Sequence, residues 1–145
     1  MDQILERLWV GDIDDALSIP KAWKNINVAF EHLRMLPNAT YLPFMLPEGD
    51  LDLSINGFLL DMVMDVIETS LSAGETVLVT CNMGQERSPL AVVWYLYRRK
   101  GMTIDEAYKL VKSKRPEIYD RREWLAPLLQ DKRELLRLKT GYWPR

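Results

Sequence analysis

The chain has 145 residues, 48% of them hydrophobic and 28% charged, with a formal net charge of −2. These values describe one soluble globular domain over residues 1–145. No apolar run reaches transmembrane length, and the N-terminus lacks the basic-then-apolar order of a signal peptide, so we expect no membrane insertion. The single cysteine, Cys81, excludes an intrachain disulfide and a cysteine-based metal site, and it indicates a reducing, cytoplasmic location.

The first 46 residues predict three strands and one short helix, each bounded by turn residues. The strands are residues 3–11, 26–32 and 40–46. Gly11 ends the first strand, and Pro43 weakens the third. A helical or turn segment over residues 12–23, interrupted by Pro20, lies between the first two strands.

A loop, a helix and a further strand follow. Residues 47–54 combine turn residues with carboxylates. Ser54 is a suitable N-cap and Gly74 a suitable end for the helix between them. Apolar residues recur in this helix at i, i+3 and i+4: Ile55, Phe58, Leu59, Met62, Val63, Val66 and Ile67. Residues 76–80 are a short continuous apolar run, typical of a strand in a sheet covered on both faces.

The remaining residues predict helices. Pro89 suits a first helical position, and residues 90–97 are apolar on nearly every side, so we expect a buried, central helix. Residues 103–106 form a capping box that begins another helix, which ends before Pro116. A last helix is predicted over roughly 121–138. Strands that precede and then alternate with helices predict an α/β domain with helices packed on a small sheet.

The charges are unevenly distributed along the chain. Residues 1–80 carry 13 acidic and 4 basic side chains, and residues 81–145 carry 8 acidic and 15 basic ones. The basic residues gather at 98–100, 112–115 and 121–122, which we interpret as solvated helix faces. The alternative is a positive rim that attracts an anionic substrate. Aromatic residues are not interleaved with them as on a nucleic-acid surface, so we expect no nucleic-acid partner.

The most informative stretch joins the strand 76–80 to the buried helix. It reads Cys81, Asn82, Met83, Gly84, Gln85, Glu86, Arg87 and Ser88. A loop before a helix N-terminus gathers backbone N–H groups into a concavity that binds an oxyanion. Gly84 permits the tight turn, and Arg87 offers a bidentate fork to phosphate oxygens. The same positive environment favours a cysteine thiolate. A lone cysteine is more often an inert core residue, but this context outweighs that interpretation.

This loop resembles the C-x5-R-S signature of the cysteine-dependent protein phosphatases. Low-molecular-weight tyrosine phosphatases also end it in Arg-Ser-Pro, but their cysteine is near the N-terminus and their acid lies downstream in an Asp-Pro motif, which this chain lacks after Cys81. Residues 4–16 and 92–116 resemble the dual-specificity phosphatases instead. The resemblance covers most of the chain and is thinnest over residues 20–46. It implies a protein-tyrosine-phosphatase-like α/β fold, with a central sheet of about four to five mostly parallel strands flanked by helices.

The resemblance also implies roles for individual residues. Cys81 would be the nucleophile that forms a phosphocysteine, Arg87 and residues 82–86 would hold the phosphate, and Ser88 would donate a hydrogen bond to the sulfur. The family places its general acid, an aspartate, roughly thirty residues before the cysteine. Asp50 lies 31 residues before Cys81 and is our candidate; Asp52 is the second choice and Glu48 the third. No metal or other cofactor is implied.

Three further residues bear on the site: Thr80, Glu86 and His32. Thr80 stands where the family commonly has histidine, and its hydroxyl is a possible substitute. Glu86 places a carboxylate inside the loop, and we expect it to point outward, toward the rim or a basic residue. His32, the only histidine, is expected to be a packed or edge residue without a catalytic role.

We therefore predict a protein phosphatase for phosphotyrosine, with phosphoserine and phosphothreonine as further substrates. A non-catalytic phosphate-binding module on the same fold is the first alternative, because of Thr80 and Glu86. The second is an enzyme for another phosphomonoester: an RNA 5′-phosphate, a phosphoinositide or a phosphoglycan.

Overall fold

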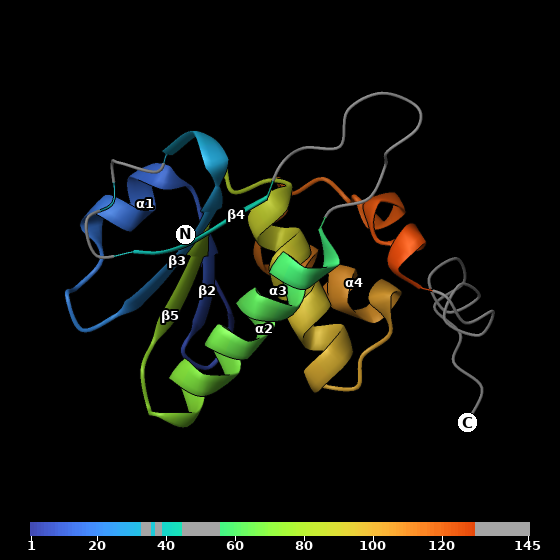
Figure 1. The fold of residues 1–145 in the computed structure, drawn as a ribbon, viewed down its shortest axis with the longest axis horizontal. Coiled ribbons are helices and arrows are strands. Elements are labelled where there is room, and N and C mark those ends of the chain that lie inside the picture. The colour runs from blue at the N-terminus through green and yellow to red at the C-terminus, as the bar shows by residue number, and fades with distance from the viewer. Residues whose placement is uncertain (33–35, 37–38, 45–55, 130–145) are drawn as a thin grey trace.

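The computed structural model describes residues 1–32, 36, 39–44 and 56–129. One sheet forms its centre, with α1 (Ile13–Ser18) on one side and α2 (Gly57–Ser72), α3 (Arg87–Arg99) and α4 (Ile104–Lys114) on the other (Figure 1). This arrangement confirms the predicted α/β fold. No helix in these described stretches is long and apolar enough to cross a membrane.

The sheet has five strands in the order β1-β2-β5-β3-β4. They are β1 (Asp2–Leu5), β2 (Leu8–Gly11), β3 (Lys24–Ala29), β4 (Thr40–Phe44) and β5 (Val77–Thr80). Only β1 runs antiparallel to its neighbour, so the expectation of four to five mostly parallel strands is confirmed. The single strand predicted over residues 3–11 is wrong, because the chain reverses at Glu6 and Arg7 and Arg7 adopts a positive φ of 63°.

Strand β5 occupies the middle of the sheet. It lies between β2 and β3, with Thr80 level with Gly11 on one side and Asn27 on the other. All four of its residues are buried, as the continuous apolar run predicted. Because parallel strands end at the same edge, the segments that follow Gly11, Ala29 and Thr80 meet there.

The helices follow their sequence signals closely, with two exceptions at their starts. The capping box of Thr103 and Glu106 is present, and Gly74 follows α2 with φ of 82°. Helix α2 begins after Asn56, whose side chain accepts a hydrogen bond from the Leu59 N–H, whereas the predicted cap Ser54 lies outside the described residues. Helix α3 begins at Arg87, so Pro89 occupies its third position and not its first.

Two other helix predictions need correction. The apolar face of α2 is rotated from the predicted one: its buried apolar residues are Leu60, Val63, Met64 and Ile67, and Phe58 is 73% exposed. In place of the start of a helix over 121–138, the structure has two 3₁₀ turns, Arg122–Trp124 and Ala126–Leu128. Pro127 contributes no N–H to a helical ladder there. Residues 130–138 lie outside the described part of the chain.

Helix α3 forms the centre of the hydrophobic core. Every residue from Arg87 to Tyr97 is buried, as the uniformly apolar run predicted. This helix continues directly from the loop after β5, so the most deeply packed helix and strand of the domain hold the two ends of residues 81–86. Tight packing of both ends makes the loop a rigid platform.

Candidate active site

Residues 81–86, here called the phosphate loop, connect β5 to α3 at the carboxyl edge of the sheet. A hollow of about 160 Å³ opens there, lined by Cys81, Asn82, Met83, Gln85, Glu86 and Arg87. A larger hollow of about 340 Å³ lies beside α1 and contains no loop residue. The smaller hollow is the candidate site because it holds the nucleophilic side chain and the N–H groups of the loop.

The carbonyl groups of residues 82–85 in the phosphate loop point outward to hydrogen-bond donors elsewhere in the chain. The bonds are Ile13 N to Asn82 O (3.2 Å), Arg115 Nη2 to Met83 O (3.3 Å), Arg115 Nε to Gly84 O (2.8 Å) and Tyr119 N to Gln85 O (2.8 Å). In a trans peptide the following N–H points opposite to the carbonyl. The N–H groups of residues 83–86 are therefore turned inward, where together they favour an anion.

Gly84 is required by this geometry. Its φ is +66°, which L-residues rarely adopt. A Cβ atom there would lie 2.6 Å from Arg115 Nη2 and 2.7 Å from the backbone of Gly11. The sequence prediction that Gly84 allows the tight turn is confirmed.

Arg115 supports the loop from behind and was not predicted as a site residue. Its side chain is only 6% exposed, and its Nη1 lies 2.8 Å from Asp2 and 3.3 Å from Glu117. Its Nε and Nη2 hold the two loop carbonyls, so the whole guanidinium is used by the protein. In the sequence Arg115 belongs to the basic cluster 112–115. Its position between the end of an amphipathic helix and Pro116 was the one signal that set it apart from the other basic residues of that cluster.

Arg87 lies at the rim of the hollow and is paired with Glu31, another residue that the sequence did not indicate. Its Nη1 and Nη2 donate to the two carboxylate oxygens of Glu31 at 2.8 and 2.5 Å. The hydrogen bond from Arg87 lowers the pKa of Glu31 against the opposing effect of burial. Burial also opposes the charge of Arg87, but the bond to Glu31 raises the pKa of the guanidinium.

The pairing with Glu31 leaves one edge of Arg87 for a ligand. No described residue accepts a hydrogen bond from Arg87 Nε. A guanidinium has five N–H donors in a planar fork, so it can hold a carboxylate through both Nη atoms and an oxyanion through Nε and one Nη. Glu31 therefore orients Arg87 without using up its donors.

The 3₁₀ turn Phe30–His32 brings three consecutive residues onto the site. The ring centre of Phe30 lies 5.7 Å from the Arg87 guanidinium carbon, and Glu31 binds that guanidinium. His32 Nε2 lies 2.8 Å from Asn82 Oδ1. His32 thus contacts the loop from outside the sheet, whereas the sequence suggested a residue within a strand.

Ser88 lies next to Cys81 as expected. Cys81 is 2% exposed, and its Sγ is 3.3 Å from the Ser88 hydroxyl. The same hydroxyl is 3.3 Å from the Gly11 carbonyl oxygen. Because the hydroxyl has one proton, it donates either to the sulfur or to the carbonyl.

Glu86 is among the residues that line the hollow, but its carboxylate pairs with a basic residue, as expected for an outward orientation. Its carboxylate lies 3.0 Å from Arg121 Nη2. The bond to Glu86 is the main reason why the pKa of Arg121 is raised. Arg121 also stacks between the rings of Tyr119 and Trp124, at 5.7 and 5.5 Å.

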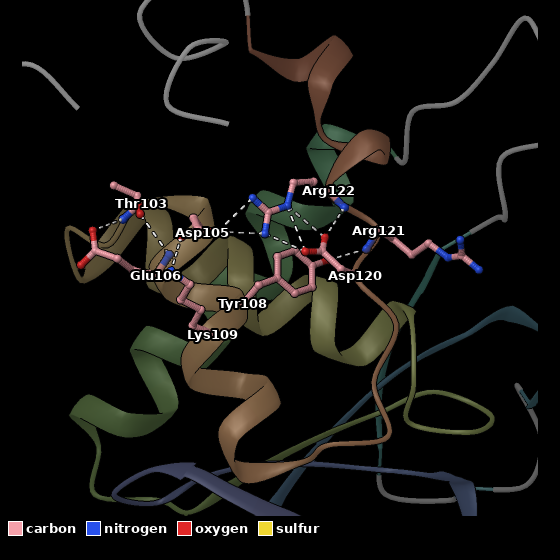
Figure 2. A network of polar contacts seen from close by, with 8 residues as sticks. All are labelled: Thr103, Asp105, Glu106, Tyr108, Lys109, Asp120, Arg121 and Arg122. Atoms are coloured by element: carbon pink, nitrogen blue, oxygen red, sulfur yellow. Dashed lines mark hydrogen bonds and ion pairs between the residues drawn. The ribbon is translucent and has the colours of Figure 1, made fainter. Parts of the chain in front are cut away.

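A polar network fixes the segment that carries Arg121 (Figure 2). Arg122 binds Asp120 at 2.7 Å and Asp105 at 3.4 Å, and it lies over the ring of Tyr108. The Tyr108 hydroxyl accepts a hydrogen bond from the Arg121 N–H at 3.2 Å. The N-terminal end of α4 therefore holds residues 120–122 beside the phosphate loop.

Within the described residues, the basic clusters do not form a rim of unpaired cations around the hollow. Residues 98–100 are exposed at the far end of α3, about 20 Å from its start at a rise of about 1.5 Å per residue. The cations that do contact the loop segment, Arg87, Arg115 and Arg121, are each paired with carboxylates. The solvated-face interpretation is the better one for residues 98–100.

The acid candidates Asp50, Asp52 and Glu48 lie outside the described residues, so their placement stays a prediction from the sequence. In the described part of the chain, no group of three or more His, Cys, Asp or Glu side chains is placed to hold a metal ion.

The family model for the dual specificity phosphatase catalytic domain matches residues 14–134. The chain belongs to this family. It is 38% identical to human dual specificity protein phosphatase 16 over 82 residues, which are 57% of this chain and 12% of that protein. It is 45% identical to Arabidopsis thaliana dual specificity protein phosphatase 1 over 56 residues, 39% of this chain and 28% of that one. The matches thus span less than a third of either relative.

Solved structures show the same fold. A mouse putative dual specificity phosphatase complexed with zinc tungstate superposes with a TM-score of 0.71 at 25% identity, covering 99% of this chain and 92% of that one. The human tyrosine phosphatase-like serine/threonine/tyrosine-interacting protein superposes with a TM-score of 0.68 at 20% identity, covering 97% and 94%. Its likeness shows the fold alone.

Proposed function

We propose that this chain hydrolyses phosphomonoesters through a phosphocysteine intermediate, with phosphotyrosine in proteins as its main substrate and phosphoserine and phosphothreonine as further ones. The observation that carries the proposal is the hollow above Cys81, where the N–H groups of residues 83–86 and the free edge of Arg87 converge. Fixed donors of this kind stabilise charge on transferring phosphoryl oxygens.

The first half of the reaction transfers the phosphoryl group to sulfur. The thiolate of Cys81 attacks phosphorus in line, and the new P–S bond forms as the bond to the ester oxygen breaks. Asp50, taken from the sequence as general acid, protonates the leaving oxygen. The loop donors and Arg87 hold the equatorial oxygens.

The second half releases phosphate. Water attacks the phosphocysteine and gives a proton to the Asp50 carboxylate, and the P–S bond breaks to return the thiolate. The Ser88 hydroxyl, 3.3 Å from the sulfur, donates a hydrogen bond to the departing thiolate. A single thiol without a second cysteine fits the reducing cytoplasm, where we place this activity.

Exposed aromatic and apolar side chains on the phosphate loop and on the segments that contact it support an aromatic substrate. Phe30, Met83 and Tyr119 are 39%, 59% and 53% exposed, and each belongs to a segment that contacts the phosphate loop or is part of it. Exposed apolar groups beside an anion site favour a phosphate carried on a ring. A panel of phosphotyrosyl, phosphoseryl and phosphothreonyl peptides with an RNA 5′-phosphate, a phosphoinositide and a phosphoglycan ranks the substrates.

The direct test compares wild type with Cys81→Ser on p-nitrophenyl phosphate. We expect turnover by the wild type and none by the variant, with binding of tungstate retained by both. Equal turnover in the two proteins would contradict the mechanism. Binding without turnover by the wild type at any pH would identify the non-catalytic module. The outward orientation of Glu86 leaves Thr80 as the remaining sequence argument for that alternative.

The general acid is tested separately. Asp50→Ala should slow alkyl phosphates much more than p-nitrophenyl phosphate, because a poor leaving group depends on protonation. Asp52→Ala is the matched variant and should leave this selectivity unchanged. The reverse result would assign the acid to Asp52.

A further inference from the structure

A buried polar contact braces the end of β5 on the sheet face that α1 covers. Asn25 is 6% exposed and Thr80 is fully buried. The Asn25 side-chain amide donates to Leu78 O and to Thr80 Oγ1, both at 3.1 Å. Asn25 lies in β3 beside Leu78 of β5, so its side chain follows β5 toward the phosphate loop.

We propose that Asn25 and Thr80 are positioning residues for the phosphate loop. This inference rests on the proposed function, because it assigns to them the task of holding that loop ready for a phosphate. Thr80 is the last residue of β5, and Cys81 follows it directly. The orientation of Thr80 therefore sets the direction in which Cys81 and the loop leave the sheet.

Hydrogen bonds from Asn25 constrain the direction in which β5 ends. An apolar contact packs a side chain without fixing its angle, whereas a hydrogen bond weakens steeply away from its preferred geometry. Both N–H donors of the Asn25 amide are used on β5, one on its backbone and one on Thr80. These two hydrogen bonds fix the position of the end of β5 beside β3 and its rotation about the strand axis.

The pair also accounts for an unusual residue. The residue before Cys81 is Thr80, whereas the phosphatases that this sequence resembles commonly have histidine there. A threonine side chain is shorter, and its hydroxyl receives its partner from the adjacent strand. Asn25 and Thr80 thus form a unit, and neither performs the task without the other.

The test uses four variants: Thr80→Val, Thr80→Ser, Asn25→Leu and the double variant Asn25→Leu/Thr80→Val. Phosphate and tungstate affinities are measured by calorimetry, turnover with p-nitrophenyl phosphate, and stability by urea unfolding. Each of Thr80→Val and Asn25→Leu should unfold at lower urea, because one buried polar group loses its partner. The double variant should recover the part of the stability that the unpaired Asn25 or Thr80 group costs, although Leu78 O still lacks the Asn25 donor.

Affinity should behave differently from stability. We expect a roughly 10-fold loss of phosphate affinity in either single variant and the same loss in the double variant, because the two residues act together. Thr80→Ser keeps the hydroxyl and should retain wild-type affinity. Trp94→Phe, which removes a hydrogen bond to Asp61 of 2.9 Å on the far side of the core, should lower stability and leave affinity unchanged.

Two results would overturn the inference: wild-type affinity in Thr80→Val, or affinity that recovers together with stability in the double variant. The latter would make the pair purely structural. If the proposed function fails, the wild type binds phosphate without turnover. The phosphate affinities of the variants then still decide whether Asn25 and Thr80 position the loop. A wild type that binds neither anion would reject both.

Discussion

The inner and outer surfaces of the phosphate loop are built from very different parts of the chain. The inner surface consists of consecutive residues, 81–87. The outer surface is held by Ile13, Glu31, Arg115 and Tyr119. Ile13 and Glu31 lie 69 and 56 residues before the positions they contact, and Arg115 and Tyr119 lie 31 to 34 residues after theirs. The chemistry of the site is therefore local in the sequence, and the geometry that makes it work is not.

Two arginines illustrate the same difference. Arg87 is bound by Glu31 at both Nη atoms, and no described residue accepts a hydrogen bond from its Nε. Arg115 uses Nε, Nη1 and Nη2 on the protein itself. Arg87 can bind a ligand, whereas Arg115 supports the conformation of the loop. Substitution of Arg87 should therefore affect mainly activity, and substitution of Arg115 should affect both stability and activity.

The largest effect is expected for Arg87→Lys. A lysine is a point charge and cannot hold Glu31 on one edge and a phosphate on the other, so kcat/KM should fall about 10²- to 10³-fold. Stability should change little. Steady-state kinetics and urea unfolding measure the two quantities. Arg121→Lys, at the partly exposed rim, is the control and should lose much less. A kcat/KM of Arg87→Lys within about 10-fold of wild type would contradict the proposal that Arg87 binds Glu31 and the phosphate at the same time.

Arg115→Met should damage both stability and catalysis. It leaves Asp2 unpaired and removes the donors from the Met83 and Gly84 carbonyls, so we expect a loss of about 3 kcal/mol in the free energy of unfolding. The loosened loop should lower kcat/KM about 10- to 100-fold. Arg99→Met makes the same change in an exposed pair with Asp65 and should cost less than about 1 kcal/mol. Equal effects in the two variants would remove Arg115 from the support of the loop.

The sequence predicted the features that depend on neighbouring residues. The cap at Thr103 and the turn at Gly84 are local, and the structure confirms them. The motif from Cys81 to Ser88 is equally local. The outward orientation of Glu86 was also predicted, from the rule that such a loop presents its backbone inward.

The features that the sequence did not predict depend on contacts between distant segments. Glu31 and Arg115 become site residues only because parallel strands and α4 end at one edge. The apolar face of α2 was misplaced because Phe58 is apolar but exposed, so periodicity alone could not fix the rotation of the helix. The hairpin at Arg7 was missed because its turn lacks glycine, and Arg7 is held there by bonds to the carbonyls of Leu71 and Glu75.

Glu31→Gln should have an intermediate effect that depends on pH. We expect a loss of about 2 kcal/mol in the free energy of unfolding at neutral pH and a roughly 10-fold lower kcat/KM, because Arg87 loses its charged partner. Since Arg87 lowers the pKa of Glu31, the stabilisation is fully present above the unfolded value of 4.5 and is lost as the pH falls through the lower folded value. The difference between wild type and variant should therefore vanish in acid.

Urea unfolding at a series of pH values measures this difference. Asp65→Asn, which removes the carboxylate from the exposed pair with Arg99, is the matched control and should show little change at any pH. Tighter phosphate binding by Glu31→Gln would mean that Glu31 competes with the ligand for Arg87 and does not orient it.

The smallest effect is expected for Glu86→Gln, although Glu86 is part of the loop itself. Its carboxylate faces Arg121, and the two side chains are 31% and 36% exposed, so the pair should contribute less than about 1 kcal/mol. Loss of a negative charge near the hollow should lower KM up to about 3-fold at low salt and leave kcat unchanged, and added salt should remove the difference. Glu123→Gln removes a charge that reaches Arg121 from outside the loop, and it should behave in nearly the same way. A fall in kcat that is confined to Glu86→Gln would show that Glu86 acts on the inner surface after all, and the division between the two surfaces would then fail at this residue.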